Sequence, residues 1–265
     1  MKRTEKIQRL IGLLLTDEPE YRSLTQNFSH DEESQRRLLR SLMNVRVPGK
    51  PLPEEYFQLQ DQLLQEEASE RGIVHTADLE PAGTDPRLVL WQGDITRLDA
   101  DAIVNAANSQ LLGCFVPCHS CIDNAIHSAA GLQLRDACAE LMNAQGYEEP
   151  TGRAKATKGY NLPAKYVLHT VGPIVAGSVT PEDKTLLADC YRSCLDLADS
   201  LHLKSIAFCC ISTGVFHFPN DLAASIAVGT VRTWLGSHPD TSVGRVIFNV
   251  FKDLDRELYR NCLSG

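Results

Sequence analysis

Apolar and polar residues alternate in two different ways along this chain, and the pattern changes between residues 72 and 87. In residues 5–15, 31–45 and 54–72 the apolar positions recur with the spacing of an amphipathic helix. Asp31 stands at a plausible N-cap, Gly72 at a plausible end, and a proline-rich stretch separates the second and third segments. We therefore predict a small helical unit over residues 1–72.

After residue 87 the apolar residues come in short continuous runs, each followed by a polar loop. The runs cover residues 87–96, 101–108, 165–173, 205–213 and 244–251. Their length and β-branched content are typical of strands buried on both faces. Helix-like stretches at 122–144, 183–201 and 221–237 separate them. Alternation of strands and helices predicts a layered α/β sheet over residues 73–265.

Composition narrows the class of protein. The 265 residues are 43% hydrophobic and 23% charged, as expected for one large core with a small added unit. A net charge of -8 with scattered basic residues argues against a nucleic acid polymer as partner. No apolar run is long enough for a membrane span, and the N-terminus lacks the features of a signal peptide. We predict a cytoplasmic protein that does not contact the membrane.

Nine cysteines in such a compartment are expected to stay reduced. Most of them lie in apolar runs or helix-like stretches, where a thiol packs as a small hydrophobic group. We expect this of Cys138, Cys190, Cys194, Cys209, Cys210 and Cys262.

Polar and glycine-bearing loops follow three of the expected strands, and ligands of α/β sheets bind at the carboxyl ends of strands. Asp94 lies in QGDIT, and its carboxylate can accept a hydrogen bond from an exocyclic amine, although alone it reads as a turn or cap residue. Asn105 and Asn108 lie in NAANSQLLG, and their amides can both donate and accept. Residues 212–214 in ISTGVFHFP offer successive backbone N–H groups, which suit a pyrophosphate.

The segment GCFVPCHSC concentrates soft metal ligands between a loop and a helix-like run. Thiolate and imidazole together favour zinc, and three ligands leave a position for water or substrate. We expect Cys114, His119 and Cys121 to bind it, because His119 and Cys121 can point the same way and Pro117 turns the chain. Cys118 in place of Cys114 is the main rival. A closed structural site with all four ligands, or four unrelated loop residues, are the other interpretations.

QGDIT, DAIVNAANSQLLG, AIHSAAG, TVGP and ISTGVFHFP together resemble the macrodomain family, over roughly residues 74–265. The cysteine-rich insertion and the helical extension resemble one subgroup, the zinc-dependent macrodomain protein-ADP-ribose hydrolases of microbes. The resemblance implies a three-layer α/β/α fold with a mixed central sheet, preceded by a small helical N-terminal extension. It therefore divides the chain into residues 1–72 and the macrodomain, residues 73–265.

The resemblance also implies roles for individual residues. Adenine is held by the Asp94 carboxylate and the Ile95 backbone N–H, and the ribose hydroxyls by the asparagine loop with Asn105 and Asn108. Asp123 takes the position of the acidic residue that orients or deprotonates a water, so Asp123 and Asn108 are the expected catalytic residues. The diphosphate loop maps to Ser212, Thr213, Gly214, Val215 and Phe216.

Two histidines have plainer interpretations. His127 lies one turn after Asp123 and is expected to be a packed helix residue, and His217 is expected to face solvent.

The function implied is removal of mono-ADP-ribose from a modified protein side chain, with one Zn²⁺ per chain and release of ADP-ribose. The alternatives are a deacetylase of O-acetyl-ADP-ribose and a reader that binds ADP-ribose without cleaving it. The resemblance further implies an ADP-ribosylated protein as partner, with a lipoyl-carrier protein modified by a sirtuin-like transferase as the candidate. We expect a monomer.

Overall fold

The structure is a computed structural model that describes residues 1–265, with every side chain except those of Leu24 and Asn27. The first 72 residues are mainly helical, as predicted. Their elements are α1 (Arg3–Asp17), the 3-10 helix η1 (Pro19–Asn27), α2 (Glu32–Val45) and α3 (Glu54–Arg71).

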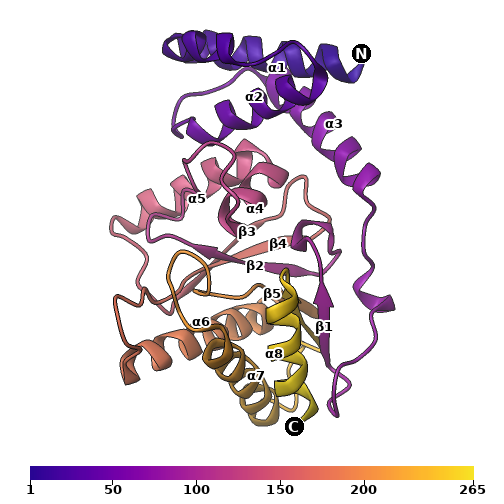
Figure 1. Cartoon of the computed structure of the whole chain (residues 1–265), viewed down its shortest axis with the longest axis vertical. Coiled ribbons are helices and arrows are strands. Elements are labelled where there is room, and N and C mark those ends of the chain that lie inside the picture. Colours follow the sequence, from indigo (N-terminus) through magenta and orange to yellow (C-terminus); the bar gives the residue numbers. More distant parts are fainter.

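Helices α1, α2 and α3 pack on one another through the apolar faces that the sequence predicts. Asp31 caps α2 by accepting a hydrogen bond from the Ser34 backbone N–H at 2.9 Å. Gly72, with a φ of +77°, ends α3. In Figure 1 the three helices form a layer above α4 and α5. Leu132 of α5 joins their small core, so the helical unit and the body of the molecule share buried surface.

The remainder of the chain is built around a six-stranded sheet in the order β1-β6-β5-β2-β4-β3. Only the β3–β4 pair is antiparallel, so the sheet is mixed as predicted. Central strands are dry on both faces: Ile103 of β2 lies between Val167 and Ala207, and none of the three is exposed. The strands are β1 (Leu88–Gln92), β2 (Ala102–Ala107), β3 (Ala154–Lys158), β4 (Tyr166–Val171), β5 (Ser205–Phe208) and β6 (Arg245–Val250).

Helices cover both faces of this sheet, which completes the predicted three-layer α/β/α fold (Figure 1). Helices α4 (Ile122–Ala130) and α5 (Leu132–Gln145) lie on the face toward the helical unit. Helices α6 (Pro181–Ser200), α7 (Asn220–Ser237) and α8 (Asp253–Ser264) lie on the other. Two short 3-10 helices, η2 (Thr76–Asp78) and η3 (Ile95–Arg97), flank β1.

Strand β3, helix α8 and a break at Gly131 were not predicted. Strand β3 (AKATK) is a half-exposed strand that pairs only with β4, so it lacks the continuous apolar run of a central strand. The expected helix over 122–144 is two helices, because Gly131 has a φ of +97° and ends α4. A Cβ at Gly131 would lie 2.6 Å from Nε2 of Gln60 in α3.

The six cysteines expected to pack as apolar residues do so. Cys138, Cys190, Cys194 and Cys209 are buried, while Cys210 and Cys262 are half-buried. None of the helices that the structure describes has the length and apolar character needed to cross a membrane.

Candidate active site

Strands β1, β2, β5 and β6 run parallel, so the loops after them meet at one edge of the sheet. Asp94, after β1, caps η3: its Oδ1 accepts from the Thr96 backbone N–H at 3.0 Å and from Thr96 Oγ1 at 2.7 Å. Both contacts use Oδ1, which leaves Oδ2 without a donor among the described side chains. Asp94 is therefore a cap residue that keeps one oxygen free to accept a further hydrogen bond.

The two asparagines of this segment differ in their surroundings, because Asn105 lies within β2 and Asn108 follows it. Asn108 is half-buried and holds its own loop, because Nδ2 donates to the Gly113 carbonyl at 3.1 Å and Oδ1 accepts from the Gln110 N–H at 3.0 Å. Asn105 is fully buried and donates from Nδ2 to Asp123 Oδ1 at 2.8 Å. Asn105 thus lies in the interior next to Asp123, and not at the open strand ends where it was predicted from the sequence.

The loop after β5 turns sharply at Ser212, whose φ is +64°. Its backbone carbonyl accepts from the Phe218 N–H at 3.0 Å, and its buried hydroxyl has no hydrogen-bond partner among the described residues. Gly172 passes so closely that a Cβ there would lie 2.0 Å from Ser212 Oγ. Gly214 and Val215 are exposed, so the backbone between them and Ser212 is open to a ligand.

The aromatic residues of this loop separate into core and surface. Phe218 is buried, whereas Phe216 is half-buried and its carbonyl accepts from the Val175 N–H at 2.9 Å. His217 is exposed, as expected from the sequence.

Cys114, His119 and Cys121 come together in the loop before α4. Their ligand atoms all lie within 4.8 Å of one another, and Cys114 Sγ is 3.6 Å from His119 Nδ1. Tetrahedral zinc bonds of about 2.0–2.3 Å place a sulfur and a nitrogen ligand about 3.6 Å apart. Two thiols and one imidazole, with no carboxylate, therefore fit a zinc ion and leave a fourth position open.

Burial affects the protonation of one of these thiols. Burial raises the pKa of Cys121 to about 11, with further increases from neighbouring Cys114 and Asp123. A neutral thiol is the stable form there without a metal, and coordination deprotonates a thiol outright.

Cys118 lies outside this group. Its backbone has a φ of +51°, and its Sγ is 3.3 Å from Ser41 Oγ and 3.6 Å from the Arg37 carbonyl oxygen, both on α2. The strained turn at Cys118 thus directs the thiol toward the helical unit, and of the two rival ligand sets the geometry favours the one with Cys114.

Asp123, at the start of α4, is buried beside the cluster. Its Oδ1 accepts from Asn105 Nδ2 and lies 3.5 Å from His127 Nε2. Burial raises the pKa of Asp123 to about 6, although the hydrogen bond from Asn105 and the charge of Arg135 lower it. His127 is a buried helix residue, as expected, and its ring lies where a Cβ at Gly113 would be 2.8 Å away. Only glycine therefore fits at the start of the metal loop.

Three further residues at the strand ends and the metal loop were not predicted from the sequence. Asn124 is fully buried between α2 and the metal loop, and Arg40 of α2 donates to its side chain at 2.7 Å. Phe251 follows β6 and is 75% exposed, and its carbonyl accepts at 3.2 Å from Nε2 of Gln92, which lies two residues before Asp94. An aromatic residue at the end of an apolar run could have been noted in the sequence, whereas the contact of Arg40 depends on tertiary structure.

Comparison with known proteins identifies the family. A family model described as Macro domain matches residues 104–227. The protein-ADP-ribose hydrolase of Treponema medium is 52% identical over 266 residues, covering 98% of this chain and 100% of that protein. The protein-ADP-ribose hydrolase of Staphylococcus aureus is 50% identical over 228 residues, covering 86% and 84%. The chain belongs to the macro domain family.

Solved structures agree with this assignment. An Oceanobacillus iheyensis macrodomain with ADP has a TM-score of 0.60 and 41% identity, covering 66% of this chain and 89% of that one. A Trypanosoma brucei macrodomain in complex with ADP-ribose has a TM-score of 0.63 and 32% identity, covering 84% and 94%. The family and the fold implied by the sequence motifs are thereby confirmed.

Proposed function

We propose that this chain is a zinc-dependent hydrolase that removes mono-ADP-ribose from modified protein side chains and releases ADP-ribose. The observation that carries the metal dependence is the group formed by Cys114, His119 and Cys121, with a sulfur–nitrogen distance of 3.6 Å. The reaction is that of the relatives named protein-ADP-ribose hydrolase, which match this chain over most of its length.

Substrate binding follows from the loops at the strand ends. The free oxygen of Asp94 accepts from the adenine amine, the Ile95 backbone N–H donates to the ring, and the exposed Phe251 offers a face for stacking. Backbone N–H groups of residues 212–216 hold the diphosphate. This order places the distal ribose toward the asparagine loop and the metal loop.

The chemistry takes place at the distal ribose. Zinc, when bound, supplies Lewis acidity that polarises oxygen groups placed beside it. Asp123 is held by Asn105 through one carboxylate oxygen, so its Oδ2 remains to orient a water or accept its proton. Asn108 shapes the loop that faces the ribose hydroxyls. A partnership with a lipoyl-carrier protein and a sirtuin-like transferase, a monomeric state and a cytoplasmic location stay predictions.

Metal content measured together with turnover tests this proposal. We expect about one zinc per chain in protein purified without a histidine tag, with ADP-ribose release lost on chelation and ADP-ribose binding kept. Cys114→Ser should lose both zinc and turnover, whereas Cys118→Ser, the matched control, should keep both. If chelation unfolds the protein, the metal is a structural element; if turnover survives chelation, the zinc proposal is wrong.

Parallel assays decide between the two hydrolase chemistries and the reader. The same preparation is offered an ADP-ribosylated protein and O-acetyl-ADP-ribose. We expect faster turnover of the modified protein; a preference for the acetyl ester would identify a deacetylase. Binding without turnover of either substrate would identify a reader.

A further inference from the structure

The metal loop, residues 113–121, has little regular structure of its own. It contains no helix or strand, and its main internal backbone hydrogen bond runs from the His119 N–H to the Val116 carbonyl at 3.2 Å. A metal site needs donors held close to their bound geometry, which neighbouring groups must supply when the loop does not.

Arg40 of α2 supplies one such contact. Its Nη2 donates to Asn124 Oδ1 at 2.7 Å and lies 3.4 Å from the carbonyl oxygen of His119, an expected zinc ligand. Asn124 in turn donates from Nδ2 to the carbonyls of Val116 at 3.0 Å and Cys114 at 3.5 Å. Arg40 thereby connects α2 to the backbone of His119 directly, and to the backbone of Cys114 and Val116 through the buried amide of Asn124.

Asn44, one turn further along α2, supplies a second contact. Its Oδ1 accepts from the Cys118 backbone N–H at 2.9 Å, at the position with a φ of +51°. Its Nδ2 donates to Ser128 Oγ at 3.0 Å, and that hydroxyl donates to Asn124 Oδ1 at 3.2 Å. Asn44 is 2% exposed, so these bonds have little competition from water.

The end of α2 is itself fixed to the macrodomain. Arg135 of α5 is buried, and its Nη1 donates to the carbonyls of Met43 at 3.0 Å, Asn44 at 2.8 Å and Arg46 at 2.7 Å. Its guanidinium also lies 4.4 Å from the ring centre of Phe115 in the metal loop. Helix α2 therefore supports the loop from a position that is fixed on α5.

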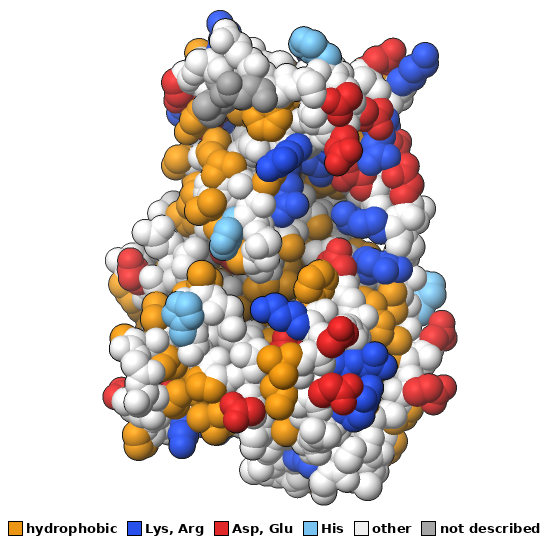
Figure 2. Space-filling model, in the orientation of Figure 1, with side chains coloured by type: hydrophobic (Ala, Val, Ile, Leu, Met, Phe, Trp, Pro, Cys, Tyr) orange, Lys and Arg blue, Asp and Glu red, His pale blue; other side chains and the backbone are white. Residues whose placement is uncertain are grey.

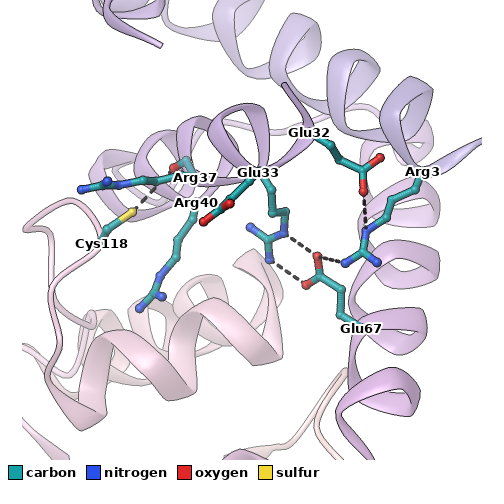
Figure 3. A pocket seen from close by; sticks show the side chains of 8 residues that line it. Arg3, Glu32, Glu33, Arg37, Arg40, Glu67 and Cys118 are labelled. Carbon is teal, nitrogen blue, oxygen red and sulfur yellow. Dashed lines mark hydrogen bonds and ion pairs between the residues drawn. The ribbon is translucent and has the colours of Figure 1, made fainter. Parts of the chain in front are cut away.

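We infer that α2 is part of the metal site, with Arg40 and Asn44 as positioning residues that hold residues 113–121 in the shape that binds zinc. Figure 3 shows Arg37 and Arg40 projecting from α2 on the side where Cys118 of the loop approaches the helix. This inference rests on the proposed zinc site. It assigns to the helical unit, which lies outside residues 104–227 matched by the family model, a role in metal binding.

Zinc affinity of the full chain, measured by competition with a chelator of known affinity, tests this inference. We expect Arg40→Ala and Asn44→Ala each to bind zinc about 10–100-fold more weakly, the usual effect of losing a group that orients a ligand. Gln60→Ala is the matched control, because Gln60 joins the helical unit to α5 by accepting from the Leu132 N–H at 2.9 Å, away from the loop. Arg37→Ala controls for loss of an exposed arginine on α2. Both controls should keep wild-type zinc affinity.

Further measurements separate positioning from charge and from folding. Arg40→Lys keeps the charge but cannot reach both acceptors, so it should remain weakened; recovery of full affinity would overturn the inference in favour of a charge effect. Melting of each variant without metal identifies any variant that fails to fold, in which case Arg40→Lys carries the test.

Three further results contradict the inference or its basis. Wild-type zinc affinity in both Arg40→Ala and Asn44→Ala overturns it. An equal loss in Gln60→Ala also overturns it, because docking of the helical unit in general would then be responsible. Absence of zinc binding by the wild-type chain refutes the proposed metal site itself, and is distinguishable because it precedes any variant.

Discussion

The helical unit and the macrodomain are stabilised in different ways. The macrodomain buries a continuous apolar core on both faces of its sheet, where Ile103, Val104 and Leu168 are fully buried. The helical unit has a small apolar core and is joined at its edges by ion pairs between helices. In Figure 2 acidic and basic side chains alternate along the upper right edge of the molecule, over this unit.

This difference bears on where the metal loop lies. The metal loop follows β2 and the asparagine loop, and α2 holds it through Arg40 and Asn44. The large core supplies a rigid edge for binding ADP-ribose, and the smaller unit supplies contacts that the loop lacks. We therefore expect ADP-ribose binding to depend on the macrodomain core, and zinc binding to depend also on the helical unit.

Truncating one core residue in each unit gives the largest expected effects. Ile103→Ala in β2 and Leu39→Ala in α2 should each lower the free energy of unfolding by about 2–5 kcal/mol, because both side chains are buried and leave a cavity. Urea unfolding measures this loss. Leu39→Ala should also weaken zinc binding while ADP-ribose affinity is kept. Unchanged zinc affinity in Leu39→Ala would show that the units act independently.

The next largest expected effect is a loss of stability in mild acid, which arises from His169 in the macrodomain. Burial lowers the pKa of His169 in β4 to about 3, whereas an unfolded histidine titrates near 6.5. The unfolded state thus binds a proton that the folded state does not, so stability is lost as the pH falls from about 6.5 toward 3. Between pH 7 and pH 5 this amounts to about 2 kcal/mol.

Comparison of the wild type with His169→Gln isolates the contribution of His169 to this loss of stability. Asp123 acts in the opposite direction, because its pKa is raised to about 6 and its folded form retains a proton that the unfolded form loses. We therefore expect the variant, although less stable at pH 7, to lose about 2 kcal/mol less than the wild type on acidification to pH 5. Equal losses in urea unfolding would contradict a buried neutral His169.

The smallest expected effects concern the ion pairs that Glu67 and Glu55 form in the helical unit. Burial alone would raise the pKa of Glu67, but hydrogen bonds from Arg36 and Arg3 lower it below its usual value. Glu67→Gln should lower the free energy of unfolding by about 1–2 kcal/mol at pH 7, and the difference should vanish as the pH falls through that lowered pKa. Glu55→Gln, which breaks the exposed pair with Arg9, should leave the urea midpoint unchanged. A similar loss in both variants would show that burial does not decide the contribution.

Several elements of the fold could be read from the sequence because their signals are local. Five of the six strands are long apolar runs, and helices α1 to α3 have clear amphipathic spacing and end signals at Asp31 and Gly72. Strand β3 was not predicted because it is an edge strand in which apolar and polar residues alternate, without a continuous apolar run. Helix α8 was not predicted because it buries only a few of its residues, chiefly Tyr259 and Leu263.

Within the site, the sequence predicted residue types better than their orientations. The group of Cys114, His119 and Cys121 follows from spacing and from the adjacency of Cys118 and His119, which turns their side chains apart. Asn105 was expected at the substrate, but a strand residue faces one side of the sheet or the other, and here that side is the interior beneath Asp123.

The sequence by itself determined the class of fold, the order of its elements and the concentration of soft ligands in one loop, because these depend on residue type and on spacing along the chain. Tertiary structure alone decided that α2 contacts that loop. Arg40 and Asn44 lie more than 70 residues before His119 and Cys118, and nothing in local spacing specifies which helix face meets which loop. Packing of Leu132 into the helical core and the hydrogen bonds of Arg135 to the end of α2 set that meeting.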